Sequence, residues 1–428
     1  WPWGAAPGSD VRLQTNLTSL IETDMTPSSS TKVQRQGRIA FESLRSLLPI
    51  SHIRRLADEH FADEVVRLLA EHIDGGQIAR LDPLGADGFM SRLPEINRAG
   101  DVDALAEFLT DVASTDGVMD LGAYEARAAM RDVGMVLGSI RRHGQQPCEV
   151  VPQIESVLIA WGRTTELVPR DTVVHYGAWN PAGVRERMYT GDPQESALID
   201  SVRQAADLIP AMAIWVATAH ARRWGTPESI AALELGAGHF DTYCANFEMV
   251  RANVTPEFFA KHLRPYFEPI TVEGRTLNGP AAAFLPLYLV DELVWGESQG
   301  AHAEMIDDAV QYGPPLWGGL VHELRRHTPM SSMLIADLDR AGHPDALERE
   351  AQIATHIINR LVQFRGRHSA LAERAYNASI TDFQHGSGGY SPDILRQITR
   401  ATIDARRQMD AALQHGHDHD ESRANGAA

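Results

Sequence analysis

An all-α fold is predicted by two features of the sequence. Apolar residues recur at helical spacing along most of the chain, as in Leu105, Phe108, Leu109 and Val112, where the period places them on one face of a helix. No series of alternating apolar and polar residues indicates a real sheet, although short extended pieces are expected at residues 173–176 and 270–272. The chain also has no internal repeat.

The pattern divides the chain into four segments. Residues 1–35 include a polar run of threonine, serine and proline and are expected to be a flexible lead-in. Residues 36–150 are expected to form a smaller helical domain, and residues 151–410 a larger one. Residues 411–428 hold histidines and aspartates at a polar terminus, where we expect a disordered tail rather than a metal site.

The bulk composition is typical of a soluble enzyme. A chain of 428 residues with 43% hydrophobic content can bury a large core. The net charge of −18 excludes nucleic acid as an expected partner, because a phosphate backbone favours the opposite sign. Cys148 and Cys244 lie far apart, so they predict neither a disulfide framework nor a zinc site. No apolar run approaches the roughly 20 residues needed to cross a bilayer, so no membrane partner is expected and the cytoplasm is the expected location.

One histidine, His368, is predicted to lie in the middle of the apolar face of a long helix over about residues 356–378. Arg365 falls one turn earlier, at the edge of the same face. A neutral imidazole in this position can bind iron, and the guanidinium can meet a half-buried carboxylate. The alternative is a core histidine hydrogen-bonded to a carbonyl, beside a solvated arginine. The apolar neighbours of the histidine at helical spacing are Leu361, Phe364, Leu371, Ala372 and Ala375.

The chain then continues to Tyr376 and to a glycine-rich loop at residues 384–390 (Gln-His-Gly-Ser-Gly-Gly-Tyr). Glycines let a backbone pass close to a bound molecule, and they leave amide N–H groups and the Ser387 hydroxyl pointing at it. An ordinary flexible connection is the alternative. The sequence has no phosphate-binding glycine motif.

The ordered set of Arg-x-x-His on a helix, a tyrosine and Gly-Ser-Gly-Gly resembles the heme-dependent tryptophan and indoleamine 2,3-dioxygenase superfamily. Within it, the nearest likeness is the monodechloroaminopyrrolnitrin synthase branch. Residues 254–266 are similar to a segment that holds paired phenylalanines and a substrate-contacting arginine. Residues 278–291 are similar to a small-residue stretch that lies against the heme, and residues 323–329 resemble a Met-Arg-Arg-Tyr-Met-Pro segment. Together these segments cover about residues 150–400.

The resemblance implies a helical heme-binding catalytic domain of the indoleamine 2,3-dioxygenase type over residues 151–410, with heme b as its cofactor. It makes His368 the proximal ligand of the heme iron and Arg365 the partner of a heme propionate. Ala281 and Ala282 would lie against the heme. The implied partners are a small aromatic amino acid and dioxygen, and the resemblance is compatible with an electron donor.

The same resemblance assigns residues to the substrate. Arg264 would correspond to the arginine that binds the substrate carboxylate, and Phe259 and Gly388 would also contact the substrate. Tyr376 and Ser387 match residues that line the substrate site in the synthase branch, and we expect both to be catalytic, with Ser387 also binding the substrate.

Departures from the dioxygenase pattern favour the synthase branch. Ser331-Ser332-Met333 replaces a His-Arg pair, Ser387 replaces a threonine, and no distal histidine is found. The expected activity is therefore oxidation of tryptophan or a halogenated tryptophan by dioxygen, with ring rearrangement or oxygenation, in the biosynthesis of a secondary metabolite such as an antibiotic. The alternatives are cleavage of tryptophan to N-formylkynurenine and a non-catalytic helical binding protein.

Overall fold

The structure is a computed structural model that describes most of the chain from residue 76 onward. The expected lead-in and the first part of the expected smaller domain lie outside the described residues. The described residues are 76–221, 224–280, 285–296, 301–313, 318, 321–322, 324–378 and 392–426.

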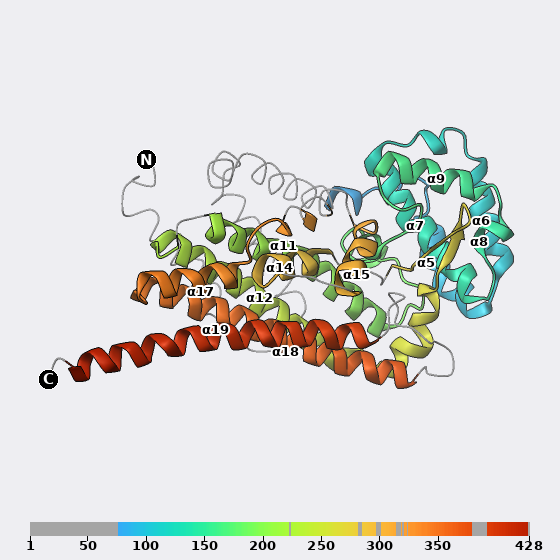
Figure 1. The fold of residues 1–428 in the computed structure, drawn as a ribbon. Coiled ribbons are helices and arrows are strands. Elements are labelled where there is room, and N and C mark those ends of the chain that lie inside the picture. Colours follow the sequence, from blue (N-terminus) through green and yellow to red (C-terminus); the bar gives the residue numbers. More distant parts are fainter. Residues whose placement is uncertain are drawn as a thin grey trace.

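The predicted all-α class is confirmed, because the regular structure of the described residues is almost entirely helical (Figure 1). In the first half of the chain the helices are α5 (Asp87–Ala99), α6 (Val102–Ser114), η1 (Val118–Asp120), α7 (Ala123–Arg142), α8 (Pro147–Val150), α9 (Ile154–Thr165), α10 (Val173–Tyr176), η2 (Gly183–Arg185) and α11 (Pro193–Ala221). The remaining helices are α12 (Pro227–Asn253), α13 (Pro256–Phe258), the π-helix η3 (Phe259–Leu263), η4 (Arg264–Phe267), α14 (Leu285–Val294), α15 (Ala301–Val310), α17 (Met330–Ala341), α18 (Asp345–Ala378) and α19 (Pro392–Gly426).

The shorter helices α5 to α9 gather at one end of the molecule (Figure 1). There α7 packs against α6 and α9, and the β1–β2 hairpin contacts α7 and α8. α9 and the hairpin therefore pack against the helices at this end of the molecule. None of the described helices is both long enough and apolar enough to cross a bilayer.

The hairpin pairs β1 (Ile270–Val272) with β2 (Arg275–Leu277) in antiparallel register, with Ile270 opposite Leu277. Glu273 and Gly274 form its two-residue turn, and both have positive φ values, of 50° and 69°. Such a turn matches the right-handed twist of the two strands. The extended piece expected at residues 270–272 is confirmed.

The extended piece expected at residues 173–176 is wrong, because these residues form the single-turn helix α10. Thr172 and His175 explain the difference. The backbone N–H of Thr172 donates to Nδ1 of His175 (3.1 Å), and the Thr172 side chain accepts the backbone N–H of His175 in return. This reciprocal cap satisfies two backbone donors that an isolated turn would leave unpaired, so it outweighs the β-preference of the two valines.

The long helices form the larger part of the molecule. α11 packs along α12, α12 packs on α18, and α18 packs on α19 (Figure 1). At Gly236 of α12, an added Cβ would lie 3.4 Å from the carbonyl oxygen of Met212 and 3.2 Å from the Val216 side chain, so glycine allows α11 and α12 to approach closely. The buried carboxylate of Glu350 in α18 accepts the backbone N–H of Gly225 (2.6 Å), which ties the connection between α11 and α12 to α18.

α19 differs from the expected disordered tail. Its buried residues, spaced three or four apart, lie on one face, and the helix continues to Gly426, through most of residues 411–428. In Figure 1 its C-terminal end extends beyond the other helices. The buried positions on this face are Ile398, Thr402, Ala405, Met409 and Ala412.

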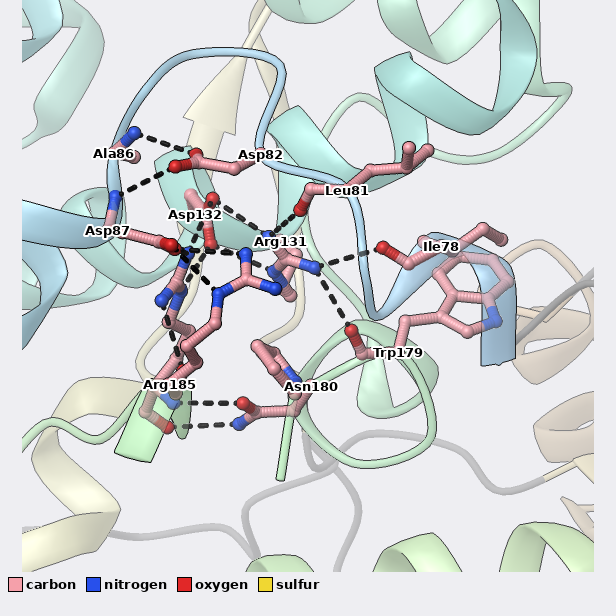
Figure 2. Close-up of polar contacts among 12 residues, drawn as sticks. Ile78, Leu81, Asp82, Ala86, Asp87, Arg131, Asp132, Trp179, Asn180 and Arg185 are labelled. Atoms are coloured by element: carbon pink, nitrogen blue, oxygen red, sulfur yellow. Dashed lines mark hydrogen bonds and ion pairs between the residues drawn. The ribbon is translucent and has the colours of Figure 1, made fainter. Parts of the chain in front are cut away.

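A buried polar network fastens the chain around residues 78–87 to α7 (Figure 2). The fully buried Arg131 donates to the carbonyl oxygens of Ile78 (3.2 Å) and Leu81 (3.1 Å) and to the carboxylate of Asp132 (2.8 Å). Asp132 also accepts a hydrogen bond from Arg187 (3.0 Å). Because every charge in this network has a partner of the opposite sign, we assign it a structural role.

Candidate functional site

His368 lies on α18, where this helix packs against α12. Its half-buried ring is stacked on Phe364 of the preceding turn, with ring centroids 5.6 Å apart and an angle of 9° between the planes. Phe247 of α12 meets the same imidazole edge-on, at 6.0 Å and 83°. The two phenylalanines therefore fix the plane of the imidazole.

The His368 imidazole is mainly neutral at pH 7. Burial lowers its pKa below the ordinary value of 6.5, and the positive charge of Arg365 lowers it further. In the described part of the chain, neither ring nitrogen has a hydrogen-bond partner, so the carbonyl required by the core-histidine alternative is not found there. A neutral imidazole with an uncommitted nitrogen is the form that ligates a metal.

Arg365 is more deeply buried than the sequence indicated. Its side chain forms an ion pair with both carboxylate oxygens of Asp291 in α14, and it donates to the hydroxyl of Thr402 in α19. Arg365 is 6% exposed and Asp291 1% exposed. The carboxylate that Arg365 meets in this structure is therefore a fully buried one from the protein itself.

An aromatic and polar cluster surrounds this ion pair. The indole N–H of Trp295 donates to Asp291 (3.2 Å), and the Arg365 guanidinium lies 5.7 Å from the Trp295 ring centroid. His302 is stacked on Trp295 at 5.8 Å, and burial lowers its pKa to about 4. Burial raises the pKa of Asp291, while the Arg365 guanidinium and the Trp295 indole oppose this shift. These contacts fix the position of the Arg365 side chain, one turn before His368 on α18.

The segment that carries Phe259 and Arg264 is built around the π-helix η3. A π-helix has a wider turn than an α-helix, and such turns are frequent at functional sites. Phe259 begins this turn, and its ring lies 6.3 Å from that of Phe267. Arg264 follows it, is 8% exposed, and forms an ion pair with Glu268 (2.6 Å). A substrate carboxylate at Arg264 would therefore compete with Glu268 or share the guanidinium with it.

Gly279 lies where the chain passes against the end of this segment. An added Cβ at Gly279 would lie 2.1 Å from the carbonyl oxygen of Phe267, so no other residue fits there without moving the backbone. This close contact explains the glycine at position 279, and it shows that the backbone of Gly279 packs against Phe267.

Five of the proposed residues cannot be placed through their side chains. Ala281, Ala282, Ser387 and Gly388 lie outside the described residues, and only the helical backbone of Tyr376, in the last turns of α18, falls within them. In the described part of the chain, no three histidine, cysteine, aspartate or glutamate side chains form a metal-binding group. Cys148 and Cys244 are both free thiols, in line with the expectation of no disulfide framework.

Three residues of the site were not found from the sequence. Asp291 carried a usable signal, because this carboxylate directly follows the apolar stretch Leu285–Val290, and a carboxylate buried beside such residues needs a partner. Thr402 and Phe247 carried no signal. A threonine on a helix and a phenylalanine on another are ordinary residues until the packing of α12, α18 and α19 is known.

The sequence of the chain also matches a known protein family. The family model described as monodechloroaminopyrrolnitrin synthase PrnB matches residues 88–418, which is most of the chain. The match extends from α5 into α19 and includes His368, Arg365 and Arg264. The family consists of heme-dependent enzymes of secondary metabolism.

Proposed function

Because the chain belongs to the monodechloroaminopyrrolnitrin synthase family, we propose that it oxidises an indole-containing amino acid with dioxygen. The proposed substrate is tryptophan or a halogenated tryptophan, and the proposed outcome is ring rearrangement or oxygenation rather than cleavage to N-formylkynurenine. The observation that carries the proposal is the neutral imidazole of His368, held between two phenylalanine rings and without a hydrogen-bond partner among the described residues.

The residues around His368 fit heme b. The imidazole offers a lone pair to iron, and its lowered pKa keeps that lone pair available in mildly acidic solution. Arg365 uses three of its five N–H donors on Asp291 and Thr402, and described residues use neither Nε–H nor the second N–H of Nη1, so two donors are left for a propionate. When bound, heme supplies the oxidising chemistry with dioxygen.

The protein would contribute binding and orientation of the substrate. We propose that Arg264 holds the substrate carboxylate and that Phe259, at the start of the π-helix, packs against the indole. Ser387 and Gly388, in the glycine-rich loop, would form hydrogen bonds with the substrate. Tyr376, near the end of α18, would line the substrate site and take part in catalysis. Small side chains at positions 281 and 282 would leave room for a flat cofactor.

The first experiment is hemin titration of the His368→Ala variant. We expect a folded protein that has lost histidine-type heme absorption, because the variant lacks the proposed iron ligand. His356→Ala is the matched control, since His356 lies on the same helix but pairs with Asp241 (3.0 Å), and it should bind hemin as the wild type does. Stoichiometric, histidine-ligated heme in His368→Ala would contradict the proposal.

A second experiment identifies the reaction. The reconstituted protein is incubated with tryptophan and with 7-chlorotryptophan, a suitable reductant and dioxygen, and the products are analysed by mass spectrometry. We expect a product other than N-formylkynurenine. N-formylkynurenine as the sole product from both substrates would indicate a dioxygenase, and a wild-type protein that takes up no hemin would indicate a non-catalytic binding protein.

A further inference from the structure

A cavity of about 630 Å³, which His368 does not line, lies where helices α5 and α7 meet the segment after α12. Its wall is formed by the C-terminal ends of α5 and α7, by residues 189–194, and by residues 255–266. This volume is in the range of small-molecule sites in proteins. The cavity is open to solvent, so it is accessible to a ligand of moderate size.

Two arginines in this wall have no ion-pair partner among the described residues. Arg98 is in the last turn of α5 and Arg142 in the last turn of α7, and both are exposed. The two carboxylates of the wall are already engaged. Glu257 pairs with Lys261 (2.8 Å), and Asp192 accepts the backbone N–H of Gln194 (2.8 Å) at the start of α11.

The overall charge of the chain makes this pair of cations more informative. The chain carries a net charge of −18, so two guanidinium groups without an ion pair in one hollow are unusual on this acidic protein. Neighbouring cations in a concave site raise the local concentration of anions.

Asn97 supplies a second and independent observation. This residue lines the cavity but is only 6% exposed, and its side-chain N–H donates to the backbone carbonyl of Tyr189 (2.9 Å). Its Oδ1 is buried and has no hydrogen-bond partner among the described residues. Buried polar atoms are normally paired, so an unpaired amide oxygen in a cavity wall indicates a missing donor. A ligand hydroxyl is such a donor.

We propose that this cavity binds a small hydroxylated oxyanion, with its carboxylate or phosphate group held by Arg98 and Arg142 and its hydroxyl donating to Oδ1 of Asn97. Guanidinium groups are suited to both kinds of anion because their N–H groups match the spacing of two oxygens. The simpler explanation is that the two arginines only complement the partial negative charge at helix C-termini. Arg163 allows this explanation to be tested, because it is an exposed arginine in the last turn of α9 and is not part of the cavity wall.

The test is isothermal titration of the full chain with malate, succinate and glycerol 3-phosphate at constant ionic strength. Malate differs from succinate by one hydroxyl, and glycerol 3-phosphate replaces the carboxylates by phosphate. We expect saturable binding of malate or glycerol 3-phosphate, and the tighter of the two identifies the preferred anion. Malate should bind roughly 2- to 10-fold more tightly than succinate, the ratio that one additional hydrogen bond provides.

The variants then assign the site. Arg98→Ala/Arg142→Ala should weaken binding roughly tenfold or more, as expected when charge-assisted hydrogen bonds are lost. Arg163→Ala should bind as the wild type does, and thermal melting checks that both variants are folded. The proposal is overturned if no probe binds saturably or if the double variant binds as tightly as the Arg163 control. Equal affinity for malate and succinate would remove Asn97 from the site.

Discussion

The ion pair between Arg365 and Asp291 provides a quantitative test of the site. Replacing Arg365 by methionine keeps most of the side-chain volume but leaves the Asp291 carboxylate without its cation. Asp291 is 1% exposed, and its one other hydrogen bond from a described side chain is the one from the Trp295 indole (3.2 Å). Breaking a buried pair on one side typically costs 3–5 kcal/mol, because a charge is left uncompensated.

The protonation of Asp291 sets an upper limit to this cost. The variant can avoid the buried charge by folding with a neutral carboxyl group. From the ordinary pKa of 3.8, taking up that proton costs about 4.4 kcal/mol at pH 7 and about 1.6 kcal/mol at pH 5. A carboxyl whose pKa is raised on folding stabilises the folded state as the pH falls. The cost of Arg365→Met should therefore be about 3–4 kcal/mol at pH 7 and should decrease markedly at pH 5.

Urea unfolding of the full chain without hemin, at pH 7 and pH 5, measures this difference. Arg365→Met/Asp291→Asn is the matched control, because it lacks both the cation and the titrating carboxyl, so its cost relative to wild type should not decrease in the same way. A cost below about 1 kcal/mol at pH 7, or a cost that does not change with pH, would show that Asp291 has another partner and would refute this reasoning.

Three further predictions concern the substrate and the histidines. Arg264→Leu should weaken binding of tryptophan far more than binding of indole in titrations of the heme spectrum, because only tryptophan has a carboxylate; equal losses would exclude the proposed role. Ser387→Ala should raise the free energy of substrate binding by about 1–3 kcal/mol if a buried donor is left unpaired, and an unchanged steady-state rate would place the loop outside the site. His302 has a pKa of about 4 in the folded protein against 6.5 when unfolded, so below pH 6.5 the unfolded chain takes up a proton that the folded chain does not. The free energy of unfolding should thus fall by about 2.5 kcal/mol at pH 4.5 through this residue, and His302→Gln should lose that part of the pH dependence.

The elements that could be predicted from the sequence are those set by local patterns. Helical spacing of apolar residues predicted α6 and the part of α18 that carries His368, because a helix needs only its own residues to display an apolar face. The prediction of an extended piece at residues 173–176 failed for a different local reason. There the preference of Val173 and Val174 for a strand is overruled by the hydrogen bonds between Thr172 and His175, which involve side-chain geometry rather than propensity.

The partners of Arg365 show why the site could be predicted only in part. Asp291 is 74 residues earlier in the chain and Thr402 is 37 residues later, so neither contact follows from the spacing of residues on α18. The sequence placed Arg365 at the edge of the apolar face, where a half-buried carboxylate would suffice. Packing of α19 against α18 and the ion pair with Asp291 of α14 remove Arg365 from solvent, and a guanidinium taken out of water requires full compensation by a carboxylate of the protein. A heme propionate at Arg365 would then be its second acidic partner rather than its first, so loss of Arg365 is expected to affect the fold and the cofactor together, whereas loss of His368 affects the cofactor alone.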